Sequence, residues 1–334
     1  MSPEVRRLGT TFVAVFGGTL LVVFAVTHAG AHRDAPPRGG PAPSSEGPVA
    51  AKGVDVKGCP AALAEARRGG TDAERYVVPG EADRTAMRDA AAMLLAKGAK
   101  GREEAVKIAA SAGFDVIDVP ELTGVVLVRE LNEKRRGGGA YLIRLDAGPA
   151  RVVVQTPHTF FDEGTLPLGC ELFQRSSASA LFIDTAHRYK AAEANENGEH
   201  PADVAHSTES IFQAMTEGVL RVAPKVTIVQ LHGFAQRESG SQVVVSSGDR
   251  RGGDDLVLRV AERIGPVVGG GVKKFPEDTN ELGATKNVQG AAVRSSGGRF
   301  VHVEMESRLR QALLKDAPLR GRYLDALAAG VSAP

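Results

Sequence analysis

The sequence has no tryptophan and only two cysteines, and aromatic residues make up just 5% of its 334 positions. It also lacks an excess of either charge, because 41 Lys and Arg residues against 40 Asp and Glu residues leave a formal net charge of +1. That balance excludes the strong overall field that draws a protein to nucleic acid or to an anionic membrane, so we expect no nucleic-acid partner. Hydrophobic residues at 43% and charged residues at 24% are typical of a globular α/β chain and exclude a fibrous or multi-span membrane protein.

Long apolar runs are also scarce, and the longest covers residues 11–27. Arg6 and Arg7 precede this run and the small residues Ala29-Gly30-Ala31 follow it, an order typical of a secretory signal. The run falls slightly short of the roughly 20 residues that a spanning helix needs, and an uncleaved membrane anchor is the alternative. Residues 1–31 therefore predict export to the periplasm or the extracellular space, with membrane association through the apolar run if the segment is retained.

The two cysteines, Cys59 and Cys170, both lie in the part of the chain that would be exported. An oxidising compartment favours pairing of an even number of thiols, which makes a Cys59–Cys170 disulfide one expectation. The alternative is that Cys170, within an apolar stretch, is a small buried hydrophobic residue. Neither cysteine has the close Cys or His spacing of a zinc ligand, so we expect no metal binding by cysteine.

Composition divides the rest of the chain into three parts. Residues 32–58 are rich in Pro, Gly, Ala and Ser and predict a disordered linker. Residues 59–113 predict a small helical segment, with helical patterns over 81–95 and 102–112 that each close on glycine. Residues 114–334 predict an α/β domain, because strand and helix patterns alternate along them.

Within that domain, short apolar runs bounded by turn residues predict strands at 114–120, 125–131, 140–146, 151–158, 180–186, 226–234, 242–248 and 299–306. Amphipathic patterns predict helices near 165–174, 207–221 and 254–264, and a last helix from about 307. Antiparallel hairpins fit the first three strands, and continuous apolar strands alternating with helices fit the others. The expected fold is a three-layer α/β/α domain with a mixed, largely parallel sheet, in which chemistry collects at the carboxyl ends of the strands.

Histidine and acidic residues stand at the ends of three of these strands. His158 and Asp162 follow the strand at 151–158, and His232 lies near the end of 226–234. Glu304 lies inside 299–306, where the period of two places it on the same face as His302. Two imidazoles and a carboxylate suit a three-ligand zinc site with an open position for water, and a further carboxylate suits a general base.

Each of these residues also has an ordinary structural explanation. A histidine at a strand end is often a satisfied polar group, and Asp162 with Glu163 could form a solvated turn. Glu304 could pair with Arg308 or Arg310 in the helix that follows. One shared site is nevertheless the more economical explanation of their common position at strand ends.

With these residues in place, the sequence resembles the phage-type poly-γ-glutamate hydrolases, relatives of the zinc carboxypeptidase and N-formylglutamate amidohydrolase superfamily. The order and spacing of the matching segments agree over roughly residues 150–315. These segments are Pro157 to Thr165, Leu231-His232-Gly233-Phe234, Asn287 with a Gly-rich turn after it, and Val303-Glu304-Met305 leading into an Arg-bearing helix.

The resemblance implies a zinc carboxypeptidase-like fold and zinc as the cofactor. It would make His158, Asp162 and His232 the ligands and Glu304 the general base. The acidic ligand in such proteins is usually glutamate, so Glu163 is the alternative to Asp162, although alignment on the Gly-Thr that follows favours Asp162. The implied substrate is a peptide or a poly-γ-glutamate-like chain.

A substrate that carries a carboxylate needs a cation near the metal, because guanidinium binds carboxylate through two parallel hydrogen bonds. Arg188, directly after the strand at 180–186, is the first candidate, and Lys286, Arg294 and Arg310 are others. His206 could orient a substrate group or a ligand.

The sequence therefore predicts an exported zinc-dependent hydrolase that cleaves an amide, peptide or γ-glutamyl isopeptide bond. The alternative is an inactive carboxypeptidase-like module that binds a cell-wall polymer or a protein partner. The substrate, the bond and the oligomeric state stay open at this point.

Overall fold

The structure, a computed structural model, describes residues 59, 75–131, 133, 135–148, 150–236 and 240–332. All the described residues belong to one compact unit. The predicted signal or anchor at 1–31 and the predicted linker at 32–58 lie outside the described residues. Among the helices that are described, none is long and apolar enough to cross a membrane.

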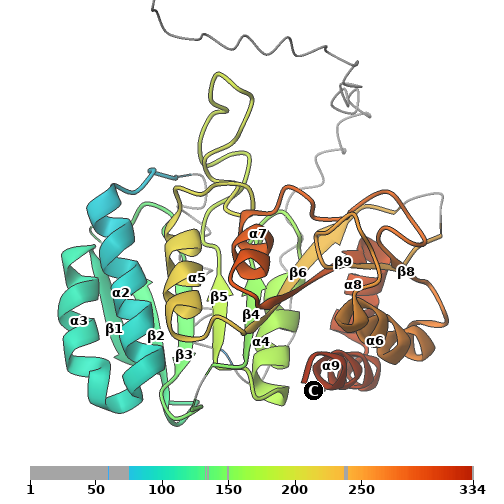
Figure 1. Cartoon of the computed structure of the whole chain (residues 1–334), viewed down its shortest axis with the longest axis horizontal. Coiled ribbons are helices and arrows are strands. Elements are labelled where there is room, and N and C mark those ends of the chain that lie inside the picture. Colours follow the sequence, from blue (N-terminus) through green and yellow to red (C-terminus); the bar gives the residue numbers. More distant parts are fainter. Residues whose placement is uncertain are drawn as a thin grey trace, which may run out of the picture. The chain divides into compact units, whose positions relative to one another are not determined.

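A mixed sheet with helices on both faces organises the described residues (Figure 1). Its strands are β1 (Phe114–Asp118), β2 (Val125–Glu130), β3 (Ala140–Arg144), β4 (Val152–Thr156), β5 (Ala180–Ile183), β6 (Thr227–Phe234), β7 (Val243–Ser246), β8 (Val272–Lys274) and β9 (Arg299–Glu306). The α-helices are α2 (Glu81–Lys97), α3 (Arg102–Ser111), α4 (Thr165–Arg175), α5 (Ile211–Val222), α6 (Asp255–Ile264), α7 (Val288–Ser295), α8 (Ser307–Lys315) and α9 (Ala317–Ser332).

The strand order across the sheet is β1-β2-β3-β5-β4-β6-β9-β7-β8. Strands β5, β4, β6 and β9 pair in parallel at the centre, β1, β2, β3 and β5 pair antiparallel on one side, and β7 pairs antiparallel with β9 on the other. The mixed sheet and the early hairpins are therefore confirmed, but parallel pairing is confined to the centre and to β7-β8. Short connections between the first three strands permit only antiparallel pairing, as predicted, whereas the antiparallel pairs β3-β5 and β7-β9 were not predicted.

Each face of the sheet carries its own hydrophobic core. Val301, Val303 and Met305 point into a cluster with α4, α6, α8 and α9, whereas Phe300 points into a cluster with α2, α3, α5 and α7. The predicted α/β/α layering is thus confirmed, and so is the period of two along β9. Helix α2 belongs to the second cluster, where Met87 packs with strand residues, so the early helices form part of a layer.

Three details of the secondary structure differ from the prediction. Strand β8 and helix α7 were not predicted, because each is short; a glycine run precedes β8 and a glycine pair follows α7. The last helix is two helices, since Pro318 cannot continue α8 and the Asp316 carboxylate accepts the Leu319 N–H at 2.9 Å as a new helix starts. Helix α5 begins after Ser210, whose hydroxyl accepts the Gln213 N–H, and not near 207.

Cys59 and Cys170 are both fully buried in the cluster around α4 and are free thiols. Burial, together with the neighbouring Cys59 thiol, holds the pKa of Cys170 well above its usual value. The two cysteines are therefore neighbours in space, without the disulfide that was one of our expectations.

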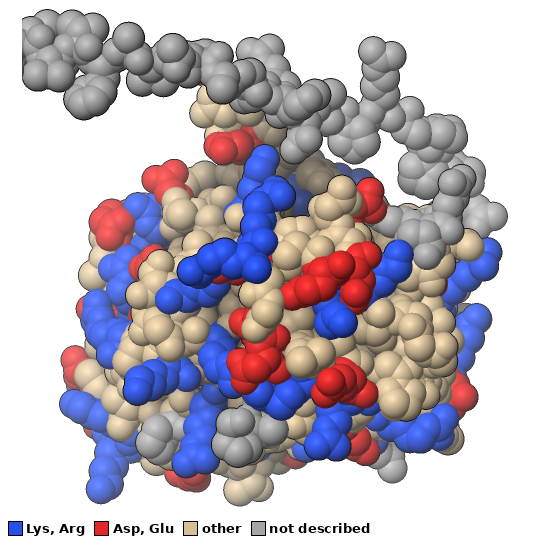
Figure 2. Space-filling model, turned by 45° about the vertical axis from the view of Figure 1, so that its right-hand side comes forward, with Lys and Arg blue, Asp and Glu red and all other residues tan. Residues whose placement is uncertain are grey.

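Acidic and basic side chains intermingle over the face drawn in Figure 2. This distribution agrees with the near-neutral net charge of the whole sequence. No field of a single sign covers the described residues on that face.

Candidate metal centre

The predicted site residues lie at the carboxyl ends of the central strands, on the face covered by α5 and α7. Gln155, Gln230 and His302 stand side by side in the register of β4, β6 and β9, and His232 stands beside Glu304 two residues further along. Strand β4 lies between β5 and β6 in the sheet. After β4 the chain therefore adds β5 on one side of it and later adds β6 on the other side. Such a switch point opens a crevice at the strand ends, where ligands bind in α/β sheets.

A tight turn after β4 brings Asp162 back to His158. The carbonyl of His158 accepts the N–H groups of Phe161 at 2.9 Å and Asp162 at 2.7 Å. Gly164, at φ 92°, then allows the chain to turn into α4. Asp162 is buried, whereas Glu163 is exposed, so Asp162 is the acidic residue that faces the histidines.

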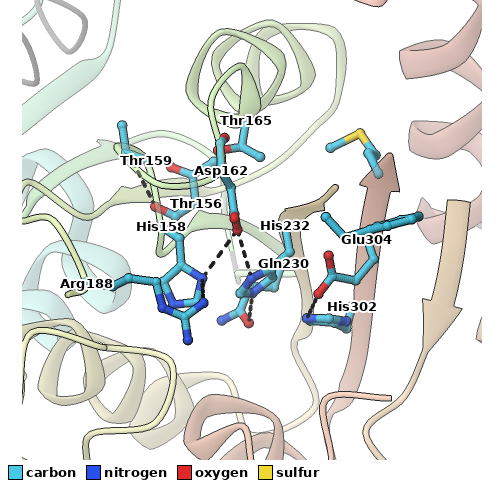
Figure 3. A network of polar contacts seen from close by, with 12 residues as sticks. Thr156, His158, Thr159, Asp162, Thr165, Arg188, Gln230, His232, His302 and Glu304 are labelled. Carbon is cyan, nitrogen blue, oxygen red and sulfur yellow. Dashed lines mark hydrogen bonds and ion pairs between the residues drawn. The ribbon is translucent and has the colours of Figure 1, made fainter. Parts of the chain in front are cut away.

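Three atoms that could bind a metal lie close together beside this turn (Figure 3). Asp162 Oδ2 lies 3.3 Å from His158 Nδ1 and 3.3 Å from His232 Nδ1, and the three residues offer ligand atoms that all lie within 4.8 Å of one another. Ligands about 2.0–2.2 Å from a tetrahedral zinc ion lie about 3.3–3.6 Å apart, so the spacing fits zinc. Asp162 Oδ2 is buried, and no hydrogen bond reaches it from the described residues, which is the condition that a cation would relieve.

The ring nitrogen of His158 that does not face Asp162 contacts a second carboxylate. This nitrogen, Nε2, lies 2.8 Å from Asp203 Oδ1, and Asp203 Oδ2 also binds Arg188 Nη2 and, at 3.0 Å, His206 Nδ1. Burial raises the pKa of Asp203, but the contacts with His158 and His206 outweigh it and hold that pKa below its usual value. Burial also opposes protonation of His158, but its contacts with Asp162 and Asp203 outweigh it, so the pKa of His158 is raised. An ionised Asp203 accepts the Nε2 hydrogen and leaves Nδ1 with a free electron pair.

His232 is held by a neutral side chain instead. Its Nε2 lies 2.7 Å from Gln230 Oε1, inside the same strand. Burial lowers the pKa of His232 to about 4, so its imidazole is neutral at pH 7 and can serve as a ligand.

Glu304 and His302 form the other half of the site. His302 Nε2 lies 3.7 Å from Glu304 Oε1, and Glu304 Oε2 and His302 Nδ1 are buried without a hydrogen-bond partner among the described residues. Burial and the nearby charge of Asp162 raise the pKa of Glu304 to about 8. Within the part of the chain that the structure describes, no ion pair joins Glu304 to an arginine.

His232, His302 and Glu304 also satisfy the spacing of a metal site. This second set shares His232 with the first, and the Nε2 of that ring is occupied by Gln230. The two sets therefore describe alternative positions for one ion. In the first position Glu304 remains available as a base, and in the second it would be a ligand.

Arg310 was predicted as a substrate cation or as a partner of Glu304, and the structure gives it a different role. Its Nε donates to the Glu163 carbonyl at 2.8 Å, and its Nη1 donates to the carbonyls of Phe234 and Met305. A Cβ on Gly233 would lie 2.1 Å from Arg310 Nη1, which explains the glycine at this position. The buried guanidinium thus ties together the three segments that carry Asp162, His232 and Glu304.

The other predicted cations divide between the site and its surroundings. Arg188 Nη1 lies 3.2 Å from His158 Nδ1, and the guanidinium covers the ring of Tyr189. His206 and Lys286 line a cavity of about 810 Å³ that also includes Asp203. Arg294 donates to the Ser247 carbonyl at 2.7 Å and therefore has a structural role.

Sequence reasoning missed Asp203, Gln230 and the unpaired state of His302. Asp203 lies in an irregular segment whose pattern gives no sign of its position. Gln230 had a usable signal, because a polar side chain inside a buried strand must find a hydrogen-bond partner. Its neighbour Gln155 carried the same signal on β4.

No protein-family model and no curated protein matches this chain. Solved structures with a similar arrangement include a zinc-free form of YndL, at 16% identity and a TM-score of 0.40, covering 60% of this chain and 94% of that one. The N-formylglutamate amidohydrolase of Ralstonia eutropha JMP134 is 14% identical at a TM-score of 0.35, over 57% of this chain and 96% of that one. The succinylglutamate desuccinylase of Chromobacterium violaceum is 13% identical at 0.40, over 69% and 73%. At these scores and identities, the matches establish neither the activity nor the ligand of this chain.

Proposed function

We propose that the protein is a zinc-dependent hydrolase of amide bonds, with His158, Asp162 and His232 as ligands and Glu304 as general base. The observation that carries this proposal is the buried Asp162 Oδ2, which lies 3.3 Å from two imidazole nitrogens and has no hydrogen-bond partner among the described residues. A buried carboxylate oxygen without a hydrogen bond is costly in an ordinary protein core, whereas a metal centre uses such an oxygen as a ligand.

A zinc ion, when bound, would polarise the scissile carbonyl and lower the pKa of a water molecule to about 7. The chain supplies the proton transfers. Glu304 Oε2, which has no other partner among the described residues, takes the proton from the attacking water and then returns it to the leaving amine. Its carboxylate form is favoured once a cation lies nearby, because an opposite charge lowers a raised carboxyl pKa.

The cations around the site favour a substrate that carries a carboxylate. When His158 Nδ1 serves as a ligand, its electron pair no longer accepts from Arg188 Nη1, which is then free to bind the substrate. Lys286 brings a further cation to the adjoining cavity, which Glu199 and Glu209 also line. A γ-glutamyl chain, with a free α-carboxylate at every linkage, fits these requirements, and so does the C-terminal carboxylate of a peptide.

We also propose that the protein acts outside the cytoplasm. The support for this is the apolar run at 11–27, with its basic residues before and small residues after. Cell fractionation that found the full-length chain only in the cytoplasm would refute export, while retention in the membrane would favour the anchor.

The test of the proposed function combines metal content with hydrolysis. Elemental analysis of the purified full-length protein should give one zinc per chain, and His158→Ala should lose it. His187→Ala is the matched control, because His187 belongs to the same region but offers no atom to the candidate centre. Equal zinc in both variants would contradict the ligand assignment. Bound zinc without hydrolysis of γ-linked oligoglutamate or of ordinary peptides would favour the inactive binding module.

A further inference from the structure

The atom of Gln230 that faces His232 decides which ring nitrogen carries the hydrogen. If the Gln230 oxygen faces the ring, His232 Nε2 must donate, and Nδ1 keeps its electron pair for a metal. If the amide nitrogen faced the ring, Nε2 would have to accept, and the hydrogen would move to Nδ1. The second state could not bind a metal through Nδ1. The orientation of one buried amide therefore controls the ligand.

Asn287 settles this orientation from a backbone contact. It is the residue before α7, and its Oδ1 accepts the Gly290 N–H at 2.8 Å. A backbone N–H can only donate, so the oxygen of Asn287 must face Gly290 and its amide nitrogen must face the other way. That nitrogen lies 2.6 Å from Gln230 and donates to Oε1. Gln230 Oε1 is then left to accept from His232 Nε2, at 2.7 Å.

A second chain of contacts, on the far side of Gln230, gives the same orientation. Gln289 Nε2 donates to the Val204 carbonyl at 2.8 Å, so Gln289 turns its oxygen toward Gln230. Gln230 Nε2 donates to this oxygen at 3.2 Å and to Gln155 Oε1 at 2.9 Å. All four amides are buried, so water cannot replace a reversed bond. The network therefore permits one arrangement in which every group finds a partner.

We propose that Asn287 is a positioning residue that fixes, through Gln230, the tautomer of His232 in which Nδ1 is free to bind a metal. This inference rests on the proposed function, because it assigns a purpose to the His232 Nδ1 electron pair. The hydrogen bond of Asn287 to the start of α7 fixes the orientation of its own side chain. Its amide nitrogen then fixes the orientation of Gln230, which contacts His232.

The variant Asn287→Asp separates the two tasks. Aspartate is the same size and still accepts the Gly290 N–H, so the start of α7 is preserved. It presents an oxygen, not a donor, to Gln230 Oε1 across a contact of 2.6 Å. We expect this repulsion to reverse Gln230, at the cost of its longer hydrogen bonds to Gln155 and Gln289. We expect zinc affinity, measured on the full-length chain by competition with a chelator, to fall about 10- to 100-fold.

The matched control is Asp254→Asn, the reverse exchange at the residue that caps α6. Asp254 accepts the N–H groups of Leu256 and Val257, and none of its hydrogen bonds within the described residues leads to the centre. This variant should bind zinc like the unchanged protein. An equal loss of affinity in both variants would mean that a cap exchange in general disturbs the site, and would overturn the proposal.

A direct measurement needs no variant of Asn287. In long-range proton–nitrogen NMR spectra of the zinc-free full-length protein, the signals of His232, assigned by their absence in His232→Ala, should place the hydrogen on Nε2. A hydrogen on Nδ1 would overturn the inference, whatever the protein binds. Failure of the unchanged protein to bind zinc would instead overturn the proposed function and leave the tautomer result standing by itself. Asn287→Asp should show the hydrogen on Nδ1, a change that a merely structural cap would not produce.

Discussion

His158 and His232 turn the same ring nitrogen toward the same carboxylate, yet the protein supports the two rings in different ways. Behind His158 stands the ionised carboxylate of Asp203, and behind His232 stands the neutral amide of Gln230. A charged partner stabilises the imidazolium form and a neutral one does not. The pKa of His158 is accordingly raised, while burial lowers the pKa of His232 to about 4. As a proposed ligand, His158 would therefore compete with protons near neutral pH, whereas His232 would not.

The two histidines would not share an ion if zinc bound on the His232 side alone, with His302 and Glu304 as its other ligands. Glu304→Gln distinguishes the two positions and should give the largest effect. Glutamine keeps the size of the side chain but cannot take a proton from water, so turnover should fall about 10²- to 10⁴-fold with zinc still bound. Loss of zinc from this variant, measured by elemental analysis, would place Glu304 among the ligands instead.

The same substitution should stabilise the zinc-free protein as the pH rises. The pKa of Glu304 is raised from 4.5 to about 8, so folding favours its protonated form. The wild-type protein therefore loses stability as the pH rises from 4.5 to 8, by about 1.4 kcal/mol for each pH unit. The difference in unfolding free energy between Glu304→Gln and wild type should grow in favour of the variant, to at most about 5 kcal/mol. A difference that moved the other way would indicate an ion pair between Glu304 and an arginine.

Asp203→Asn removes the charge that sets His158 apart from His232. We expect zinc affinity to fall about 10- to 100-fold, because the ring loses the partner that fixes its tautomer. The pKa of His158 in the zinc-free protein should also fall, since burial then acts with less opposition. His206→Ala is the control, because it removes another neighbour of Asp203 and leaves the bond to His158 in place. Unchanged zinc affinity in Asp203→Asn would show that Asp203 supports Arg188 and not the metal centre.

The pH dependence of zinc binding should show the protonation of His158 and that of His232 as two separate steps. Binding requires both imidazoles to be neutral, and below the raised pKa of His158, which exceeds 6.5, each bound zinc must displace one proton. Affinity should therefore fall about tenfold per pH unit from there to about pH 4, and more steeply once His232 is also protonated. Chelator competition at several pH values measures this slope, and the measurement uses Glu304→Gln so that the proton of Glu304 does not contribute. Two protons displaced throughout the range would show that the two supports are equivalent.

Local patterns predicted the part of the site that lies at strand ends. The apolar run before His158 and the alternation around Glu304 mark a strand in the sequence itself, and parallel neighbours bring their carboxyl ends together. His232 was predicted by the same reasoning. These residues could be named because their positions depend on secondary structure, which short stretches of sequence largely determine.

The supporting residues could not be named in this way. Asp203 reaches His158 from an irregular loop, and Asn287 reaches Gln230 from the start of a helix too short to be predicted. Arg310 was assigned to a substrate because its three carbonyl partners come from segments far apart in the sequence. Such contacts depend on how the layers pack, and no local pattern records them.

The most direct test of the account is the position of the ion in crystals of the full-length protein grown with zinc. Anomalous scattering at the zinc edge should give one peak bounded by His158 Nδ1, Asp162 Oδ2 and His232 Nδ1, with Glu304 outside bonding distance. A peak bounded by His232, His302 and Glu304, or none near these residues, would contradict it.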